Sequence, residues 1–358
     1  MQALLDCIAQ LTPPDHACRL FHGRGGRFPG CEHLTLDAYP PVLVLTSFKA
    51  LEAQTLDAID RALTQRYALL ERALHWVFQQ RQSGQPAHTQ LMRGSVPEPH
   101  IVREGDARYR VRLLQGQNHG LFLDMAAGRQ WVAQHIASHP RRAQGLRVLN
   151  LFAYSCAFSV VALQAGAREV VNIDMASGAL ATGRENHQLN GLSGARFLAH
   201  DIFSSWGKLK RMGPYDLVIS DPPSYQKGSF VATKDYARLV RRLPELLTPD
   251  GHALLCLNAP ELDSAFLRAQ VQEHAPSLRL VQRLPNPPVF ADVDEERSLK
   301  VLVYQKACDL VARQRTKAAV TPAPAPHSTP LPMPAQGGAW LGYYVSCSTP
   351  RTPIKPLQ

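Results

Sequence analysis

The fold that we expect follows from RVLNLFAYSCAFS, residues 147–159. Its first part, Arg147 to Phe152, is an apolar run with the length of a buried strand. Small residues come next, and helical spacing then extends from Ser155 to Ala165. A tight turn of small residues between a strand and a helix lets backbone amides approach a ligand. The segment therefore predicts a strand, a ligand-binding turn and a helix.

The same alternation of strand and helix extends from Gly145 to about Lys306. Apolar runs predict six further strands, at Glu169 to Asp174, Ala195 to Ala199, Tyr215 to Ser220, His252 to Leu257, Leu278 to Leu284 and Leu299 to Gln305. Helical spacing predicts three further helices, at Ala176 to Leu189, Thr233 to Leu247 and Glu261 to His274. This order predicts an α/β fold, a doubly wound Rossmann-like sheet of parallel strands with helices on both faces.

Ligands of such sheets bind at the carboxyl ends of the strands, so the residues at these ends are the candidate site. The second strand ends in Asp174, where a carboxylate can accept both hydroxyls of a ribose. The third is followed by Asp201-Ile202-Phe203, which can bind an adenine amino group and sandwich the ring. The fourth is followed by Asp221-Pro222-Pro223. Each acidic residue alone fits a helix cap equally well, but four consecutive strand ends of the right kind predict a nucleoside-containing cofactor.

Two cofactors suit these strand ends, and the motifs separate them. A nicotinamide-binding domain would carry GxGxxG after the first strand, which is absent. It also gives no reason for Asp-Pro-Pro. The pattern therefore favours S-adenosylmethionine (SAM), with methyl transfer at Asp221-Pro222-Pro223-Ser224-Tyr225.

Several separate motifs between about His16 and Lys306 resemble the class I methyltransferases that act on large-subunit ribosomal RNA. These motifs are GQNHGLFLDMAAGR (Gly116 to Arg129), LNLFAYSCAFS, ENHQLNGL and DPPSYQ. The resemblance implies that Asp174 holds the cofactor ribose, that Asp201 lies at the adenine and that Asp221 lies at the transfer site. It also implies that Phe122, Asp124 and Arg129 close over the cofactor or position the target, although Phe122 fits hydrophobic packing at a domain junction equally well. The other candidate cofactor contacts are Asn150, Phe152, Tyr154, Ser155 and Ile202.

Two features depart from the family. Its first turn is usually Tyr-Thr-Gly-Gly-Phe, whereas this chain has Tyr154-Ser155-Cys156-Ala157-Phe158. Losing both glycines restricts positive φ, so either the turn is built without those conformations or cofactor binding is weakened. A PUA-type RNA-binding module, which some relatives carry at the N-terminus, is not evident in the sequence.

The cysteines bear on which atom is methylated. Carbon-5 of a pyrimidine needs a cysteine that first adds to the ring. Relatives with that chemistry carry the cysteine after the fifth strand, where this chain has Asn258. Cys256 lies inside the strand and is expected in the core, and Ser346-Cys347-Ser348 lies in the tail, where we regard it as a coincidence.

Nitrogen methylation needs no cysteine. Asp221 and the Pro222 carbonyl can accept the hydrogens of an exocyclic amine, while Tyr225 stacks on the base. Guanine N7 needs only positioning. We therefore expect direct transfer to a base nitrogen, although the same motif also serves protein glutamine methylation.

The N-terminal part, residues 1–115, predicts a small α+β module with a possible RNA contact. Pro40 to Phe48 predicts a buried strand, Leu51 to Gln80 predicts an amphipathic helix, and the runs around Glu104-Gly105-Asp106 predict a hairpin. The formal net charge of +10 suggests a polyanionic partner. Basic residues cluster in HGRGGRFPG, with Arg19 nearby, in the segment from Arg103 to Arg112, and at Lys208, Lys210 and Arg211.

The methyltransferase domain is expected at residues 116–306, followed by a Pro-rich tail, 307–358, that we expect to be disordered. Seven scattered cysteines without a CxxC pair argue against structural zinc or disulfides and for a reducing cytoplasm. No apolar run is long enough for a membrane span, and no signal sequence is evident. Three functions stay open: an RNA base methyltransferase, a protein or small-molecule methyltransferase, and a catalytically silent RNA-binding assembly factor.

Overall fold

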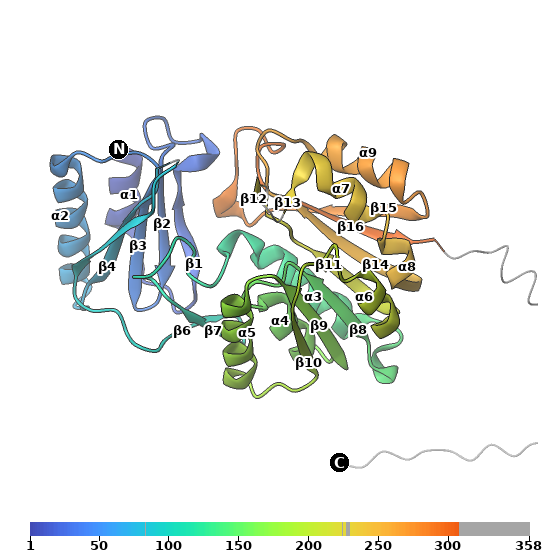
Figure 1. Cartoon of the computed structure of the whole chain (residues 1–358). Helices are drawn as coiled ribbons and strands as arrows, with labels where there is room; N and C mark the ends of the chain where they lie inside the picture. The colour runs from blue at the N-terminus through green and yellow to red at the C-terminus, as the bar shows by residue number, and fades with distance from the viewer. Residues whose placement is uncertain (83, 224, 227–229, 308–358) are drawn as a thin grey trace, which may run out of the picture. The chain divides into compact units, whose positions relative to one another are not determined.

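A seven-stranded sheet forms the scaffold of the C-terminal half, in the order β10-β9-β8-β11-β14-β16-β15 (Figure 1). The computed structural model describes residues 1–82, 84–223, 225–226 and 230–307. The strands are β8 (Arg147–Leu151), β9 (Glu169–Asp174), β10 (Ala195–Ala199), β11 (Tyr215–Ser220), β14 (Leu247–Leu257), β15 (Leu278–Leu284) and β16 (Lys300–Lys306). The first five in the sheet are parallel, whereas β16 is antiparallel to both of its neighbours. The sheet is therefore mixed, and the predicted parallel order holds for five strands.

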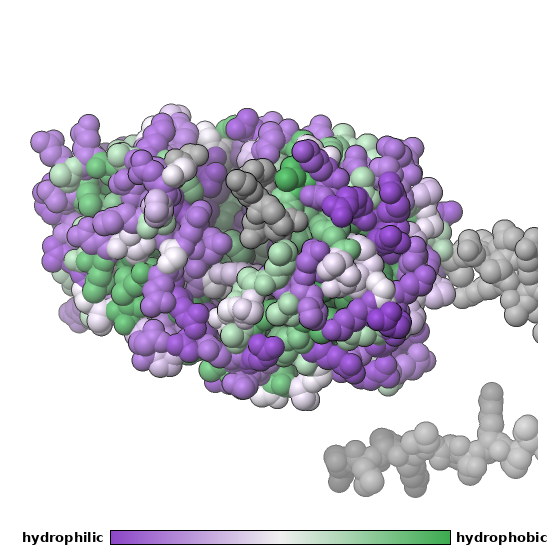
Figure 2. Space-filling view, in the orientation of Figure 1, coloured by the Kyte–Doolittle hydropathy of each residue, from purple (hydrophilic) through white to green (hydrophobic). Residues whose placement is uncertain are grey.

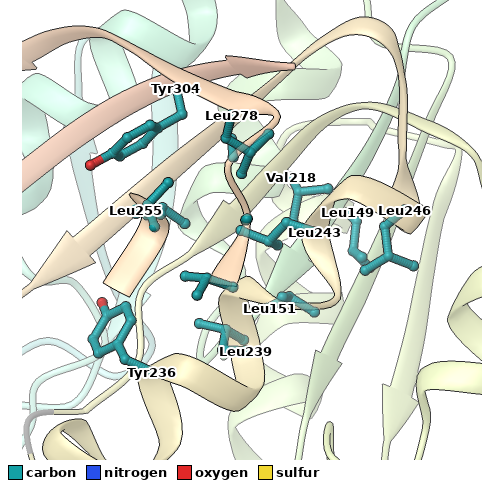
Figure 3. Close-up of a cluster of buried hydrophobic side chains, with 14 of the residues drawn as sticks. Leu149, Leu151, Val218, Tyr236, Leu239, Leu243, Leu246, Leu255, Leu278 and Tyr304 are labelled. Carbon is teal, nitrogen blue, oxygen red and sulfur yellow. The ribbon is translucent and has the colours of Figure 1, made fainter. Parts of the chain in front are cut away.

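Helices cover both faces of this sheet, as predicted for a doubly wound fold. The helices are α3 (Ala126–Ser138), α4 (Ala157–Gln164), α5 (Ser177–Leu189), α6 (Trp206–Met212), α7 (Ala232–Val240), α8 (Leu243–Leu246) and α9 (Ser264–His274). Alternate residues of β8 enter different cores: Val148 packs with residues of α3 and α4, and Leu149 with residues of α6 to α9. Figure 3 shows the second core, where Leu149 and Leu151 of β8 lie in one cluster with Leu239 of α7. The predicted helix Thr233 to Leu247 is two helices.

The N-terminal part contains a second sheet, of five strands in the order β1-β2-β3-β4-β5. These strands are β1 (Cys18–His22), β2 (Leu34–Tyr39), β3 (Val42–Ser47), β4 (His75–Gln80) and β5 (His88–Arg93). Helices α1 (Gln2–Gln10) and α2 (Ala53–Leu69) contribute Leu4, Ile8, Ile59 and Leu63 to its core. Figure 2 shows a mostly hydrophilic face with scattered apolar patches. The strand predicted at Pro40 to Phe48 is confirmed as β3.

The helix predicted from Leu51 to Gln80 is wrong in its second half. Helix α2 ends at Leu69, Glu71 has a φ of 53°, and the chain then forms β4, parallel to β3. Trp76 and Val77 are fully buried in β4, which lies between β3 and β5. Aromatic and β-branched side chains suit such a central strand, and pairing on both edges outweighs the helical spacing of the apolar residues.

The hairpin predicted around Glu104-Gly105-Asp106 is confirmed as β6 (His100–Glu104) and β7 (Ala107–Val111). It is held against α5 by side chains of the ENHQLNGL segment. Asn186 Oδ1 accepts from the backbone N–H of Arg110 at 2.8 Å, and Asn190 Oδ1 accepts from that of Arg108 at 2.9 Å. Arg110 also pairs with Glu185 at 3.0 Å. Much of this basic cluster therefore serves to dock the hairpin.

Candidate active site

A cavity of about 350 Å³ lies at the carboxyl ends of β8, β9, β10 and β11, where the topology predicts a ligand. We call it the cofactor cavity. The predicted site residues on its wall are Phe122, Asp124, Arg129, Phe152, Tyr154, Ser155, Asp174, Asp201, Ile202, Asp221 and Pro222. Residues from four strand ends and from the 122–129 segment thus converge on one space, although they are distant in sequence.

Among the described side chains of the predicted set, Asn150 is not on that wall. Asn150 is 1% exposed in the sheet, and its amide donates to Asn172 Oδ1 at 2.9 Å. Tyr225 lies in the short strand β12 (Tyr225–Gln226), whose backbone pairs with β13 (Phe230–Val231). The side chain of Tyr225 and all of Ser224 lie outside the described residues.

The turn after β8 keeps left-handed backbone without glycine. Phe152, Tyr154 and Cys156 have φ values of 55°, 47° and 61°. Of the two alternatives for this turn, the one in which it is built without such conformations is therefore wrong. Each such residue costs about 1–3 kcal/mol, which the surrounding structure has to offset.

Hydrogen bonds from three directions hold this strained turn. Asp174 Oδ2 accepts from the Tyr154 backbone N–H at 2.8 Å. The Ser155 hydroxyl donates to the Gly120 carbonyl at 2.6 Å, and the Asn186 amide donates to the Ser155 carbonyl at 2.9 Å. Asn186 also binds β7, so it links the hairpin to the turn. The turn is thus fixed before any ligand binds.

The Cys156 side chain fits because of a glycine on α5. Cys156 is fully buried, and a Cβ built on Gly183 would lie 2.5 Å from its sulfur. Gly183 therefore leaves the space that the thiol fills. Burial raises the pKa of Cys156 far above its usual value, so the group stays a neutral thiol.

Asp174 and Asp201 are oriented by backbone amides. Asp174 Oδ1 accepts from the Ala176 N–H at 2.8 Å, in addition to the bond from Tyr154. Asp201 accepts from the backbone N–H groups of Phe203 and Ser204, both at 3.1 Å. A carboxylate has about four acceptor positions, so each group can still bind a ligand hydroxyl or amine.

Two carboxylates and one arginine line the cavity near the fourth strand end. Arg129 is 2% exposed and donates to both carboxylate oxygens of Glu104, at 2.6 and 2.7 Å, and to the Phe122 carbonyl at 2.8 Å. Burial, and then the charge of Asp124, raise the pKa of Asp221 to about 7, against the effect of Arg129. Burial also raises the pKa of Asp124. An added positive charge would therefore stabilise the ionised form of Asp221.

Phe122 is on the cavity wall rather than packed away at a junction. Its side chain is 41% exposed, and its ring centroid lies 5.2 Å from that of Tyr154. The two rings therefore form an aromatic border where the 122–129 segment approaches the first turn.

Comparison with known proteins agrees with this geometry. A family model described as S-adenosylmethionine-dependent methyltransferase matches residues 18–305. The chain belongs to the S-adenosylmethionine-dependent methyltransferases. Ribosomal RNA large subunit methyltransferase I of Aeromonas hydrophila is 32% identical over 294 residues, which cover 77% of this methyltransferase and 72% of the relative.

Solved structures extend the likeness of this methyltransferase to the fold. The structure of "a putative SAM-dependent methyltransferase from Streptococcus mutans" matches with a TM-score of 0.73 at 25% identity, covering 85% of this chain and 81% of that one. A SAM-dependent methyltransferase from Agrobacterium tumefaciens shares the fold, with a TM-score of 0.57 at 18% identity, covering 83% of this chain and 91% of that one. The methyl donor of this methyltransferase is SAM, as the strand ends predict.

The structure adds wall residues of this methyltransferase that the predicted set omits. They are Asn118, Met125, Ala153, Ala157, Phe158, Met175, Ala176 and Asn258, whereas Phe203 and Pro223, also on the wall, belong to the predicted strand-end motifs. Met175 and Ala176 were within reach of the sequence, because they directly follow the predicted Asp174. Asn118 and Met125 lie in the motif Gly116 to Arg129, for which the resemblance implied roles only for Phe122, Asp124 and Arg129.

Proposed function

We propose that this methyltransferase transfers the methyl group of SAM to a base nitrogen of ribosomal RNA. The relative from Aeromonas hydrophila is named for a ribosomal RNA substrate, which supports an RNA substrate here. The formal net charge of +10 suits a polyanion as well. SAM supplies a methyl group on a positively charged sulfur, so the protein has to bind the cofactor, exclude water and orient the accepting nitrogen.

The cofactor cavity has suitable groups for each part of SAM. Asp174 retains acceptor positions for the two ribose hydroxyls. Asp201 can accept from the adenine amino group while Ile202 and Phe203 contact the ring. The Tyr154–Ser155 turn and the aromatic border at Phe122 would then adjoin the methionine end.

The described cavity wall contains no cysteine, and this observation is the reason for proposing transfer to a nitrogen rather than to carbon-5 of a pyrimidine. Cys156 points toward Gly183, and Cys256 is fully buried in β14, where its carbonyl accepts from the Tyr236 hydroxyl. Burial raises the pKa of both thiols, and the thiolate is the nucleophile that carbon-5 methylation needs. Asn258 is the residue that the fold brings to the wall after β14.

Asp221 and Pro222 would position the accepting nitrogen. The ionised Asp221 carboxylate and the Pro222 carbonyl can accept the two hydrogens of an exocyclic amine, which directs the lone pair of the nitrogen toward the methyl group. We expect Tyr225 to stack on the base. The positive sulfur of the cofactor favours the ionised Asp221, which counteracts the burial that raises its pKa to about 7.

We also propose that residues 1–115 contact the RNA, that residues 116–306 carry out the transfer, and that the protein works in the cytoplasm. The five-stranded sheet supports the first assignment, because its residues reach the 118–124 segment of the cavity wall. For example, Tyr39 donates to the Leu121 carbonyl at 3.3 Å. In the described residues, no helix is both long and apolar enough to cross a membrane.

The test compares ribosomal RNA from cells with and without the gene, digested to nucleosides and analysed by mass spectrometry. We expect one N-methylated purine to disappear from large-subunit RNA in the deletion strain and to return with the wild-type gene. An unchanged set of modifications would contradict an RNA substrate. Loss of 5-methylcytidine would contradict transfer to nitrogen.

A further inference from the structure

A second cavity, of about 360 Å³, adjoins the cofactor cavity. Asn118, Phe122, Asp124 and Asn258 line both spaces, so the two cavities meet at these side chains. The other walls come from the N-terminal sheet and from the segment between β15 and β16. A group held in the second cavity can therefore approach the place where the methyl group is expected.

Arg24 is held in this cavity by its two neighbouring glycines. A Cβ on Gly23 would lie 1.8 Å from the Cys31 carbonyl oxygen, and one on Gly25 would lie 2.3 Å from that of Ala291. Both positions therefore exclude a side chain. The Gly25 carbonyl also accepts from the Val293 N–H at 2.9 Å, which ties the 22–30 segment to the β15–β16 connection. The backbone on both sides of Arg24 is thus packed tightly.

The guanidinium of Arg24 lies over the ring of Phe48, 4.1 Å from its centroid. Stacking on one face of the plane leaves the N–H groups at its edge directed outward. Arg24 forms no ion pair with any carboxylate in the part of the chain that the structure describes. Its charge is therefore available to an anionic ligand.

A second arginine, Arg81, faces the same space. Its Nη2 donates to the Gln117 carbonyl at 2.8 Å and to Asn118 Oδ1 at 3.0 Å, which fixes the side chain. Its Nε is buried and has no hydrogen-bond partner in the described structure. A buried donor without a partner is unfavourable, so an acceptor group of a ligand brought to Arg81 would remove that cost.

The remaining charged groups on the module's wall are satisfied. Arg19 donates to Asp37 through two bonds, at 2.7 and 3.0 Å, and its Nη1 donates to His22 Nδ1 at 2.8 Å. Burial and then the charges of Arg19 and Arg24 lower the pKa of His22 to about 4, so the ring is neutral at pH 7. Arg19 and Asp37 cancel, which leaves Arg24 and Arg81 as the module's excess charge in the cavity.

We propose that the second cavity binds the target nucleotide of the RNA, with Arg24 and Arg81 holding its phosphate and the base directed toward Asp124 and Asn258. The planar fork of arginine matches phosphate oxygens, and two fixed arginines define one phosphate position. This inference rests on the proposed function, because an RNA substrate supplies the phosphate. It goes further, since it names where the substrate binds and which residues of the module bind it.

The test measures the affinity of the full chain for RNA and for S-adenosylhomocysteine (SAH), the demethylated form of SAM. The proteins compared are the wild type, Arg24→Ala, Arg24→Lys and the control Arg27→Ala. Arg27 is in the same Gly-rich segment and is exposed, as Arg24 is, but it lies outside both cavities. The probe is a fluorescein-labelled single-stranded RNA 20-mer of mixed sequence, titrated at several salt concentrations with saturating SAH. Large-subunit RNA from a deletion strain serves to measure methylation.

We expect Arg24→Ala to weaken RNA binding by about tenfold and to reduce the salt slope by about 0.7–1. SAH affinity should stay within twofold, and Arg27→Ala should match the wild type. Arg24→Lys should recover the salt slope but only part of the affinity, because lysine lacks the planar fork. Equal losses in Arg24→Ala and Arg27→Ala, or no loss in either, would overturn the inference.

The same measurements separate this inference from the proposed function. If wild-type protein binds the RNA through Arg24 but transfers no methyl group to ribosomal RNA, the proposed function fails and the phosphate site stands. If the wild type methylates the RNA and Arg24→Ala does so with an unchanged KM, the site fails and the function stands. A parallel loss of SAH affinity in Arg24→Ala would assign Arg24 to cofactor binding and overturn the inference.

Discussion

The two cavities of this protein meet at four side chains but are built in different ways. The cofactor cavity is made mainly from strand ends of one sheet, which a parallel topology brings to the same edge. The second cavity joins segments from the N-terminal sheet, the 117–124 segment and the β15–β16 connection. A site formed by successive strand ends of one parallel sheet can therefore be predicted from the sequence, whereas a site formed between two modules can be found only in the structure.

The two cavities are therefore expected to have separate functions. Changes in the cofactor cavity should alter SAM affinity or the methyl-transfer step and leave RNA affinity unchanged. Changes in the second cavity should do the reverse. Each experiment below would sharpen this division or break it.

The largest expected effect is that of Asp221→Asn. Removing a preorganised charge at a reaction centre costs about 10²–10³ in kcat, and we expect a loss of that size. RNA affinity should stay within twofold. Because the pKa of Asp221 is raised, the folded protein binds this proton more tightly than the unfolded chain, so the stability of the fold decreases as the pH rises from about 4 to about 7. The variant should therefore melt at or above the wild-type temperature. Full activity in Asp221→Asn would place the transfer elsewhere.

Asp174→Asn should raise the Kd for SAM by about 10- to 100-fold, because hydrogen bonds to charged groups contribute about 1.5–3 kcal/mol. Isothermal titration calorimetry measures this effect, and Asp57→Asn, an exposed position on α2, is the matched control. RNA binding should be unaffected. A loss of RNA affinity equal to the loss of SAM affinity would show that the cavities do not act separately.

The pH dependence of the transfer should follow the ionisation of Asp221. With a pKa of about 7 in the free enzyme, the fraction ionised falls as the pH falls. We expect kcat/KM for SAM to decrease by about fivefold between pH 7 and pH 6 and to level off above pH 8. In the pH profile of kcat, the decrease toward acid should occur at lower pH, because the positive sulfur of bound SAM favours the ionised carboxylate of Asp221. Profiles of both parameters that are flat between pH 6 and pH 8 would exclude this role.

A smaller effect is expected at the first turn. Gly183→Ala places a methyl group 2.5 Å from the Cys156 sulfur, and overpacking of this kind costs about 1–3 kcal/mol. Urea unfolding measures the change. The double variant Gly183→Ala/Cys156→Gly should recover most of the stability, because it removes the clash and puts glycine at a φ of 61°. Additive destabilisation in the double variant would show that the two positions are not coupled.

Most of the catalytic fold and the lining of the cofactor cavity could be predicted from the sequence. Asp174, Asp201 and Asp221 lie at or just after the ends of strands that clear apolar runs predict. Parallel pairing then brings these strand ends to the same edge of the sheet. Asn150 differs because it precedes the last residue of β8, so its side chain lies within the sheet, bonded to Asn172. Asn150 lies one residue before the end of its strand, whereas Asp174 is the last residue of β9 and lines the cavity.

Other features depend on contacts that no local pattern shows. The residues from Leu70 to Gln80 have helical spacing, yet pairing with β3 on one side and with β5 on the other makes the last part a strand. The missing glycines of the first turn left a different backbone as one of two alternatives, but Gly183 and Asn186 of α5 support the left-handed backbone. From the sequence, Arg24 was only one member of a basic cluster, whereas the structure shows that its guanidinium lies over the ring of Phe48.

The central claim is that this enzyme methylates a base nitrogen of ribosomal RNA through Asp221. The direct measurement incubates purified protein with methyl-labelled SAM and large-subunit RNA from a deletion strain, then identifies the labelled nucleoside by chromatography. We predict label in a single N-methylated purine, incorporated about 10²–10³-fold more slowly with Asp221→Asn. Label in 5-methylcytidine, or no label in RNA from a folded wild-type protein that binds SAM, would contradict the account.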